Sequence, residues 1–416
     1  MSLTLNIAWQ HKNKLVIFSL LGITLLGDAM LYVVLPAQAS ALALTAGQIG
    51  ILLSINRIIR LGSNFWATVV YEKFGRNLPF YFAVVIGSAV TLGYSLSHSF
   101  WYLLLLRLIW GLSYSLLRLR ALLTIFSSRA RPDIQGRLSG IYRSISRIGY
   151  MTGMIAGGVL ADLFSFSGAA LILGAISFFS VIILLVFYIL CFQEKDLGPG
   201  PLKPELKTSA NFLNLFTDKA FFLLLLAGII VHFTTRGLIN SSYGLFLQQS
   251  FGYEIALPVV GVTIGVASLN GFILSSNSVI ELIFSPLLGW IVDKFKKKQL
   301  IFWGLLGQSL LIISLILMDS LVVAMVAPLF IFLLTAFLII LLYIKVNNIA
   351  LQTTSRRMAA LTTAGDLGAA LGPLTLFFVD LGSSLSSIYL VYGLIIALMA
   401  FYQRKQLKPV KSGGNK

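Results

Sequence analysis

The chain has 416 residues, of which 58% are hydrophobic and 11% charged. A soluble protein of this length does not need so many apolar residues for its core, so the composition predicts a membrane protein with many spanning helices. The formal net charge of +17 would suggest nucleic-acid binding in a soluble protein, so the distribution of this charge along the chain decides its meaning.

Apolar stretches of spanning length follow one another from one end of the chain to the other. They cover residues 15–37, 48–70, 79–97, 101–126, 138–161, 168–192, 221–247, 266–292, 299–318, 321–350, 358–379 and 384–402. We therefore expect twelve transmembrane helices. Residues 250–267 are apolar but rich in glycine and too short for a further span, and we expect them to form part of an outer loop.

The basic residues test this arrangement, because Lys and Arg collect in cytoplasmic loops. Every second loop carries them, from Lys12 and Lys14 to the tail that begins at Arg404, whereas the intervening loops contain neither residue type. This alternation places both termini in the cytoplasm and fits a bacterial inner (cytoplasmic) membrane. The positive charge is thus an orientation signal, and we expect the lipid bilayer, and no nucleic acid, as a partner.

One long polar segment, residues 193–218, contains Gly and Pro residues that disfavour regular structure. It predicts six-helix bundles at 1–192 and 219–403, followed by a basic cytoplasmic tail at 404–416. The halves are related, since a shift of 221 residues lays 276–298 on 55–77. Repeated six-helix units build many secondary transporters. The predicted fold class is therefore an all-α membrane protein with twelve helices in two repeated bundles.

The turn after the second predicted helix resembles the signature of the major facilitator superfamily, Gly-x-x-x-Asp-Arg-x-Gly-Arg-Arg. It appears here as Thr68, Glu72, Lys73, Gly75 and Arg76, and in the repeat as Gly289, Asp293, Lys294, Lys296 and Lys297. An acid at a helix end can pair with basic groups and a facing helix N-terminus in one conformation and release them in another. The expected gate residues are Glu72, Lys73, Gly75, Arg76, Asp293 and Lys294. The alternative is an ordinary basic cytoplasmic turn.

Two further motifs resemble the drug and proton antiporter branch of that superfamily. Arg107 and Gly111 match its Arg-x-x-x-Gly motif, and the resemblance implies that the arginine assists proton transfer. Residues 149–158 match its Gly-x-x-x-Gly-Pro-x-x-Gly-Gly motif, except that Met154 stands where proline belongs. Small residues at that spacing also serve close helix packing alone, and the missing proline leaves the direction of transport open.

Several charged side chains fall inside the predicted spans, where each would cost about 2.5 to 3.5 kcal/mol if it met lipid. Counted from residue 48, Arg57 and Arg60 lie about 14 and 18 Å into a hydrocarbon core about 30 Å thick, on one helix face. The first half offers one intramembrane acid, Asp28, against these and further arginines. Because guanidinium groups bind carboxylate or phosphate bidentately, we expect an anionic ligand. The alternative is that the arginines cap carbonyls, reach the interface or pair with Asp28.

The candidate site residues are the polar residues expected at membrane depth. Candidate substrate ligands are Asn56, Arg57, Arg60, Arg118, Arg147, Arg236, Asn277 and Lys345, and candidate proton-coupling residues are Asp28, Arg107, Glu281 and Asp366. Asp28 comes first, because the resemblance implies a titrating acid on the first helix; the alternative is a static pair with Arg57 or Arg60. We interpret His232 as a lining residue.

The sequence contains no nucleotide-binding P-loop, zinc-protease motif or cysteine and histidine metal spacing, so we predict neither an enzyme nor an ATP-driven pump, and no cofactor or metal. The predicted function is proton-coupled secondary transport of a small organic anion, such as a carboxylate metabolite or a siderophore, by a monomer. The first alternative is export of amphiphilic drugs in exchange for protons. The second is a non-transporting receptor or assembly factor built on the same fold.

Overall fold

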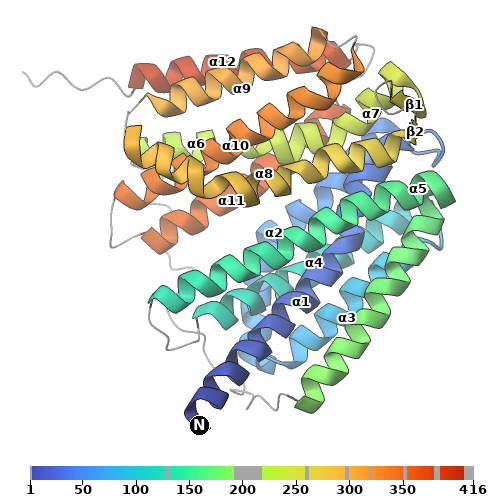
Figure 1. Cartoon of the computed structure of the whole chain (residues 1–416), viewed down its shortest axis with the longest axis vertical. Helices are drawn as coiled ribbons and strands as arrows, with labels where there is room; N and C mark the ends of the chain where they lie inside the picture. Colours follow the sequence, from blue (N-terminus) through green and yellow to red (C-terminus); the bar gives the residue numbers. More distant parts are fainter. Residues whose placement is uncertain are drawn as a thin grey trace, which may run out of the picture. The chain divides into compact units, whose positions relative to one another are not determined.

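The computed structural model describes residues 2–126, 132–191, 218–257, 262–295, 299–317, 320–349, 354–378 and 385–406. Its helices are α1 (Ser2–Ala37), α2 (Ala46–Phe74), α3 (Leu78–Gly93), α4 (Phe100–Phe126), α5 (Pro132–Cys191), α6 (Lys219–His232), the π-helix η3 (Phe233–Ile239), α7 (Asn240–Phe251), α8 (Val266–Phe295), α9 (Leu300–Ser314), the 3-10 helix η4 (Leu315–Leu317), α10 (Leu321–Ile349), α11 (Thr354–Phe378) and α12 (Leu385–Gln406) (Figure 1). Nearly all of the predicted linker at 193–218 and most of the tail at 404–416 lie outside the described residues.

The all-α membrane fold predicted from the sequence is confirmed. Among the described residues, seven helical segments are long and apolar enough to cross a membrane, and α3 and α9 are shorter apolar helices. The long element α5 covers two predicted spans, 138–161 and 168–192, and the backbone between them leaves the helical conformation at Ser165, with φ 68° and ψ 174°. Conversely, the predicted span 221–247 consists of α6, η3 and α7 in succession. Hydropathy thus located the apolar segments and missed these local changes of helix geometry.

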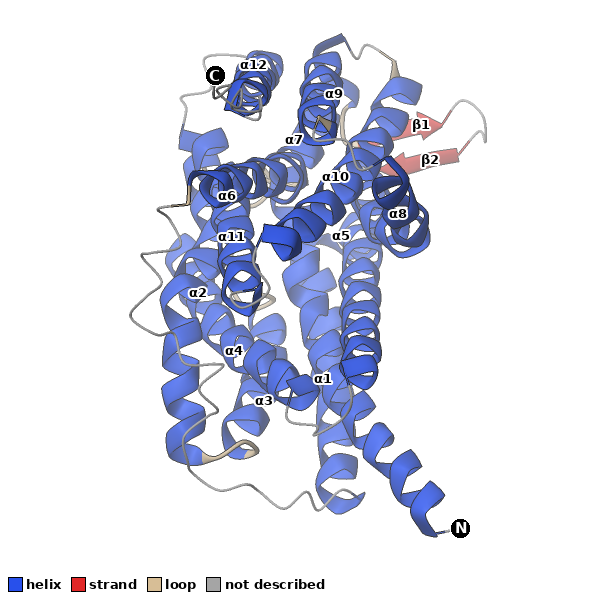
Figure 2. Ribbon diagram, turned by 90° about the vertical axis from the view of Figure 1, so that its left-hand side faces the viewer, coloured by secondary structure: helices blue, strands red, loops and turns tan. Residues whose placement is uncertain are grey.

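Residues 250–267 contain more regular structure than the outer loop that the sequence predicts. Strands β1 (Glu254–Leu257) and β2 (Val262–Gly265) pair antiparallel, with Glu254 opposite Gly265 and Leu257 opposite Val262 (Figure 2). Ile255 on β1 is buried. The backbone N–H of Val266 donates to the carbonyl of Tyr253 at 2.9 Å, so that the hairpin leads directly into α8. The segment is therefore a hairpin and not an extra span.

The described chain forms two compact units, and the division between them runs through the segment 193–218 and through further points of the chain. Unit 1 consists of Met1–Lys207, Gly237–Ser278 and Ala370–Phe378, and unit 2 of Thr208–Arg236, Val279–Ala369 and Val379–Lys416. Besides the division between residues 207 and 208, boundaries fall within η3, α8 and α11 and at the end of α11. Hydrogen bonds explain why parts of the second half belong to unit 1: Ser54 donates to the Ala370 carbonyl at 2.7 Å, and Asn270 donates to the Val33 carbonyl at 3.1 Å.

In unit 1, α1 lies along the part of α5 that precedes Ser165, which we call the first arm of α5 (Figure 1). The glycine motif at residues 149–158 makes this close approach possible. A Cβ on Gly149 would lie 2.1 Å from the Gly22 carbonyl oxygen, and one on Gly153 would lie 2.5 Å from the Leu26 carbonyl oxygen. Met154, at the position of the missing proline, is buried. The packing interpretation of this motif therefore agrees with the structure.

Unit 2 has its own packing between α6, η3, α9, α10, α11 and α12. A Cβ on Gly368 of α11 would lie 2.1 Å from the Ile229 carbonyl oxygen of α6. A buried polar chain joins η3, α10 and α9: the hydroxyls of Thr235 and Thr335 are 2.6 Å apart, and Gln308 donates to Thr335 at 3.0 Å. Hydrogen bonds therefore join the π-helix η3 to α10, and α10 to α9, in addition to the apolar packing of unit 2.

Candidate functional site

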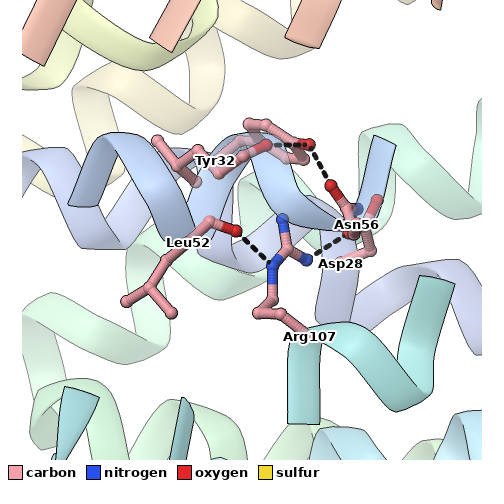
Figure 3. Close-up of polar contacts among 6 residues, drawn as sticks. Asp28, Tyr32, Leu52, Asn56 and Arg107 are labelled. Atoms are coloured by element: carbon pink, nitrogen blue, oxygen red, sulfur yellow. Dashed lines mark hydrogen bonds and ion pairs between the residues drawn. The ribbon is translucent and has the colours of Figure 1, made fainter. Parts of the chain in front are cut away.

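The predicted coupling residue Asp28 lies in the C-terminal half of α1, and its carboxylate is almost enclosed. Its side chain is 11% exposed. One carboxylate oxygen, Oδ1, accepts from Nη1 of Arg107 at 2.5 Å and from Nδ2 of Asn56 at 3.0 Å (Figure 3). Three helices, α1, α2 and α4, therefore meet at this one carboxylate. Of the polar residues predicted for the site, Asp28, Asn56 and Arg107 are thus brought into direct contact.

Arg107 is the largest fully buried side chain of the described structure. Besides Asp28, its guanidinium engages the backbone of α2, since Nε donates to the Leu52 carbonyl at 2.7 Å (Figure 3). A buried charge is tolerated when it is paired and hydrogen-bonded, and removing one partner of such a pair typically costs about 3 to 5 kcal/mol. The pair therefore fixes the relative position of α1, α2 and α4 as long as Asp28 is ionised.

Tyr32 extends this cluster and was not anticipated from the sequence. Its hydroxyl donates to the Leu53 carbonyl at 3.0 Å and is 3.4 Å from Oδ1 of Asn56. The Arg57 guanidinium carbon lies 4.6 Å from the centre of the Tyr32 ring, and the Tyr150 ring centre lies 6.4 Å from it. Tyr32 follows Asp28 by four residues and so shares its helix face, which is the sequence signal that could have identified it.

Asp28 forms its ion pair with an arginine other than the two that the sequence suggested for a static pair. The sequence offers Arg57 or Arg60 for this role, whereas the ion pair runs to Arg107. Arg57 is buried against Tyr32, and the Arg60 guanidinium carbon lies 4.9 Å from the ring centre of Tyr114 on α4. Cation–π contacts of this kind orient a guanidinium against the face of an aromatic ring. Both arginines therefore bring positive charge next to aromatic rings in unit 1.

The other arginines of the first half differ in burial. Arg120 is buried, donates to Oδ1 of Asn77 at 3.3 Å and to the Tyr188 hydroxyl at 3.4 Å, and therefore joins three helix ends. This agrees with the alternative in which some arginines have a structural role. Arg118 and Arg147 are half-buried, and Arg143 is exposed.

Candidates of the second half are divided between the two units. Asn277 on α8 belongs to unit 1 and is buried, and no donor among the described residues reaches its Oδ1 atom. Arg236 lies in the π-helix, and Glu281, Lys345 and Asp366 lie on α8, α10 and α11; all four are half-buried members of unit 2. His232, at the end of α6, is buried and lines a small hollow in unit 2 together with Gly228, Ile339, Leu342, Tyr343 and Leu361.

The predicted gate residues lie at the ends of α2 and α8. Gly75 ends α2 with φ 78°, a conformation that favours glycine, so this motif position has a backbone reason. Glu72 and Arg76 are half-buried, and Lys73 is exposed with its Nζ 5.2 Å from the Phe74 ring centre. In the repeat, Lys294 lies with Nζ 4.7 Å from the Trp290 ring centre. The side chain of Asp293 is outside the described part, so its pairing stays a prediction.

Comparison with known proteins agrees with this architecture. The family model of the Major Facilitator Superfamily matches residues 17–373. The chain is 27% identical over 247 residues to the inner membrane transport protein YnfM of Escherichia coli, covering 58% of this chain and 57% of YnfM. It is 24% identical over 256 residues to the multi-drug resistance efflux pump PmrA of Streptococcus pneumoniae, covering 61% of this chain and 59% of PmrA. The matches thus span less than two thirds of these relatives.

Solved structures share the fold across nearly the whole chain. A bacterial homologue of the human lysosomal transporter Spinster, in an inward-facing and unoccupied conformation, superposes with a TM-score of 0.74 at 17% identity, covering 95% of this chain and 97% of the other. The nucleoside transporter NupG gives a TM-score of 0.71 at 14% identity, covering 95% and 98%. The solved structures share the fold of multi-pass membrane transporters, and the matched family model shows that the chain belongs to the Major Facilitator Superfamily.

Proposed function

We propose that this transporter moves a small organic anion across the inner membrane by proton-coupled alternating access, as a monomer with both termini in the cytoplasm. The observation that carries the proposal is the charge balance of α1, α2 and α4. These helices contain five arginines, and their carboxylates are Asp28 and, at the end of α2, Glu72. Arg57 and Arg60 are two of these five arginines, and their guanidinium groups suit the carboxylate or phosphate of an anionic ligand.

In this proposal Arg57 and Arg60 bind the anion. Both are three residues apart on α2 and therefore share a face. Their contacts with Tyr32 and Tyr114 support the guanidinium planes. Asn56, Arg118, Arg147 and Asn277 supply further polar groups, and Arg236 and Lys345 are the corresponding candidates of unit 2. A carboxylate or phosphate suits a planar guanidinium fork because two parallel hydrogen bonds form at once.

Asp28 is the proposed proton carrier. Protonation of its carboxylate removes the charge that attracts Arg107, while the bond from Arg107 to the Leu52 carbonyl remains. The three helices that meet at Asp28 are then held less tightly, so that proton binding and helix movement are linked. Arg107 has a positioning role in this step, and Glu281 and Asp366 are further candidates for the proton path in unit 2.

Export of amphiphilic drugs is the second candidate function. It is favoured by the name of one relative, a multi-drug resistance efflux pump, and by the aromatic rings of Tyr32, Tyr114 and Tyr150 close to the arginines of unit 1. Aromatic rings suit amphiphilic cations. The arginine excess disfavours such ligands in this chain, because each cation would enter a region of positive charge.

An experiment can distinguish the two functions. The thermal unfolding temperature of the purified protein is measured with citrate, succinate or benzoate, and separately with the cationic dye ethidium. The anion proposal predicts stabilisation by at least one carboxylate and none by ethidium, and the stabilisation disappears in Arg57→Gln. Arg143→Gln, which alters an exposed arginine, is the matched control and keeps it. Stabilisation by ethidium alone, or an unchanged carboxylate effect in Arg57→Gln, rejects the anion proposal.

A further inference from the structure

Asp162, at the end of the first arm of α5, contacts the first turn of a helix more than 100 residues away. Its Oδ2 atom accepts from the backbone N–H of Ser268 at 2.6 Å, and Oδ1 accepts from that of Ala267 at 3.3 Å. The N–H groups in the first turn of α8 have no partners within their own helix and form the positive end of its dipole. Asp162 therefore caps α8 as an N-cap side chain would, but from another helix of unit 1.

Glycines bring the two helices close enough for this cap. A Cβ on Gly158 of α5 would lie 2.3 Å from the Ala267 carbonyl oxygen, and one on Gly271 of α8 would lie 2.5 Å from the Met154 carbonyl oxygen. A Cβ on Gly265 would lie 2.2 Å from the carboxylate carbon of Asp162 itself. The backbones of α5 and α8 thus approach closely next to the cap, and Gly265 of β2 leaves room for the Asp162 carboxylate.

Helix α1 joins the same contact region. Asn270, one turn into α8, donates to the Val33 carbonyl of α1 at 3.1 Å, and Ala37 of α1 lies against Gly244 of α7. Ala37 is fully buried there. We call this end of unit 1 the outer face, because the loops at this end, residues 38–45, 94–99 and 252–265, contain no Lys or Arg.

We infer that Asp162 is a positioning residue of the transport cycle, the latch that holds the outer face closed. In alternating access one repeat moves against the other, and in this inference α5 of the first repeat and α8 of the second separate at this face when the outer side opens. Separation breaks both hydrogen bonds of Asp162 and leaves the first turn of α8 uncapped. The latch is distinct from the predicted gate at the opposite ends of α2 and α8, and it rests on family membership and not on the proposed substrate.

The latch is tested by the accessibility of a buried cysteine at the outer face. The single native cysteine is replaced in Cys191→Ser, and Ala37→Cys then reports opening by its rate of reaction with a water-soluble maleimide in purified, detergent-solubilised protein. We expect Asp162→Ala to raise the rate by about twofold to thirtyfold, the range that corresponds to the loss of one helix cap. Asp162→Asn, which keeps one acceptor oxygen, gives a smaller increase.

Thr45→Ala is the matched control. Thr45 caps α2 at the same face, with the Gln48 N–H donating to its hydroxyl at 3.3 Å, but it does so within its own helix. Its loss should leave the reaction rate unchanged. If Asp162→Ala yields no folded protein, Gly265→Ala displaces the carboxylate from the other side and should raise the rate instead. Equal rates in the parent and the Asp162 or Gly265 variant, or an equal increase in Thr45→Ala, overturn the latch.

Discussion

The ion pair between Asp28 and Arg107 can be tested by a double-mutant cycle on the free energy of unfolding. The guanidinium of Arg107 is fully buried, so complete loss of its charged partner would cost about 3 to 5 kcal/mol. Asp28→Asn keeps an oxygen that can accept from Arg107, and a hydrogen bond with one charged partner is worth about 1.5 to 3 kcal/mol. The retained bond offsets part of the full loss, so we expect Asp28→Asn to destabilise the protein by about 1.5 to 2 kcal/mol.

The second variant of the cycle, Arg107→Gln, loses both the charge and the bond to the Leu52 carbonyl. In the double variant, two neutral amides replace the pair, so its destabilisation should be smaller than the sum of the single effects by about 2 kcal/mol. Unfolding by dodecyl sulfate in mixed micelles, followed by the fluorescence of the six tryptophans, gives the free energies. Additivity within about 0.5 kcal/mol would refute the energetic coupling of the two residues.

Two further predictions concern substrate binding and helix packing. Arg57→Gln and Arg60→Gln should each weaken the binding of a stabilising carboxylate by about tenfold to a hundredfold in a ligand titration, with partial recovery on substitution by lysine, since an ammonium keeps the charge without the planar fork. Gly149→Ala should destabilise the protein by about 1 to 3 kcal/mol in the same unfolding assay, because its Cβ would meet the Gly22 carbonyl. Gly62→Ala is its control, since no heavy atom lies within 4 Å of the added carbon, and an equal loss in both variants would contradict the packing argument.

The hydrophobic pattern was sufficient to predict the helical segments, because membrane-spanning helices need long apolar runs whatever their neighbours are. The superfamily was recognised from the motif after the second predicted helix and its repeat. It could not predict the kink at Ser165 or the π-helix Phe233–Ile239. Both are changes in backbone geometry that leave the local composition apolar. The hairpin at residues 254–265 was missed for a similar reason, since a short apolar run with β-branched residues is compatible with a loop, a strand or a helix end.

The membership of the site was easier to predict than its pairing. Asp28, Asn56 and Arg107 were chosen as candidates because polar residues are rare at membrane depth, and the resemblance to the antiporter branch also pointed to Asp28 and Arg107. Which arginine meets Asp28 depends on the rotation of α1, α2 and α4 about their axes, and residue spacing within one helix does not define this. Asp162 was not chosen, because its role depends on the N-terminus of α8, more than 100 residues later in the chain.

Proton-driven accumulation in proteoliposomes tests the account most directly. The parent protein and Asp28→Asn are reconstituted, a pH gradient is imposed, and movement of the radiolabelled carboxylate that stabilises the parent most is followed. The account predicts that the parent accumulates the anion against its gradient, whereas Asp28→Asn exchanges labelled for unlabelled anion without accumulating it. Gradient-driven accumulation by Asp28→Asn at the parent level would contradict the assignment of Asp28 as the proton carrier.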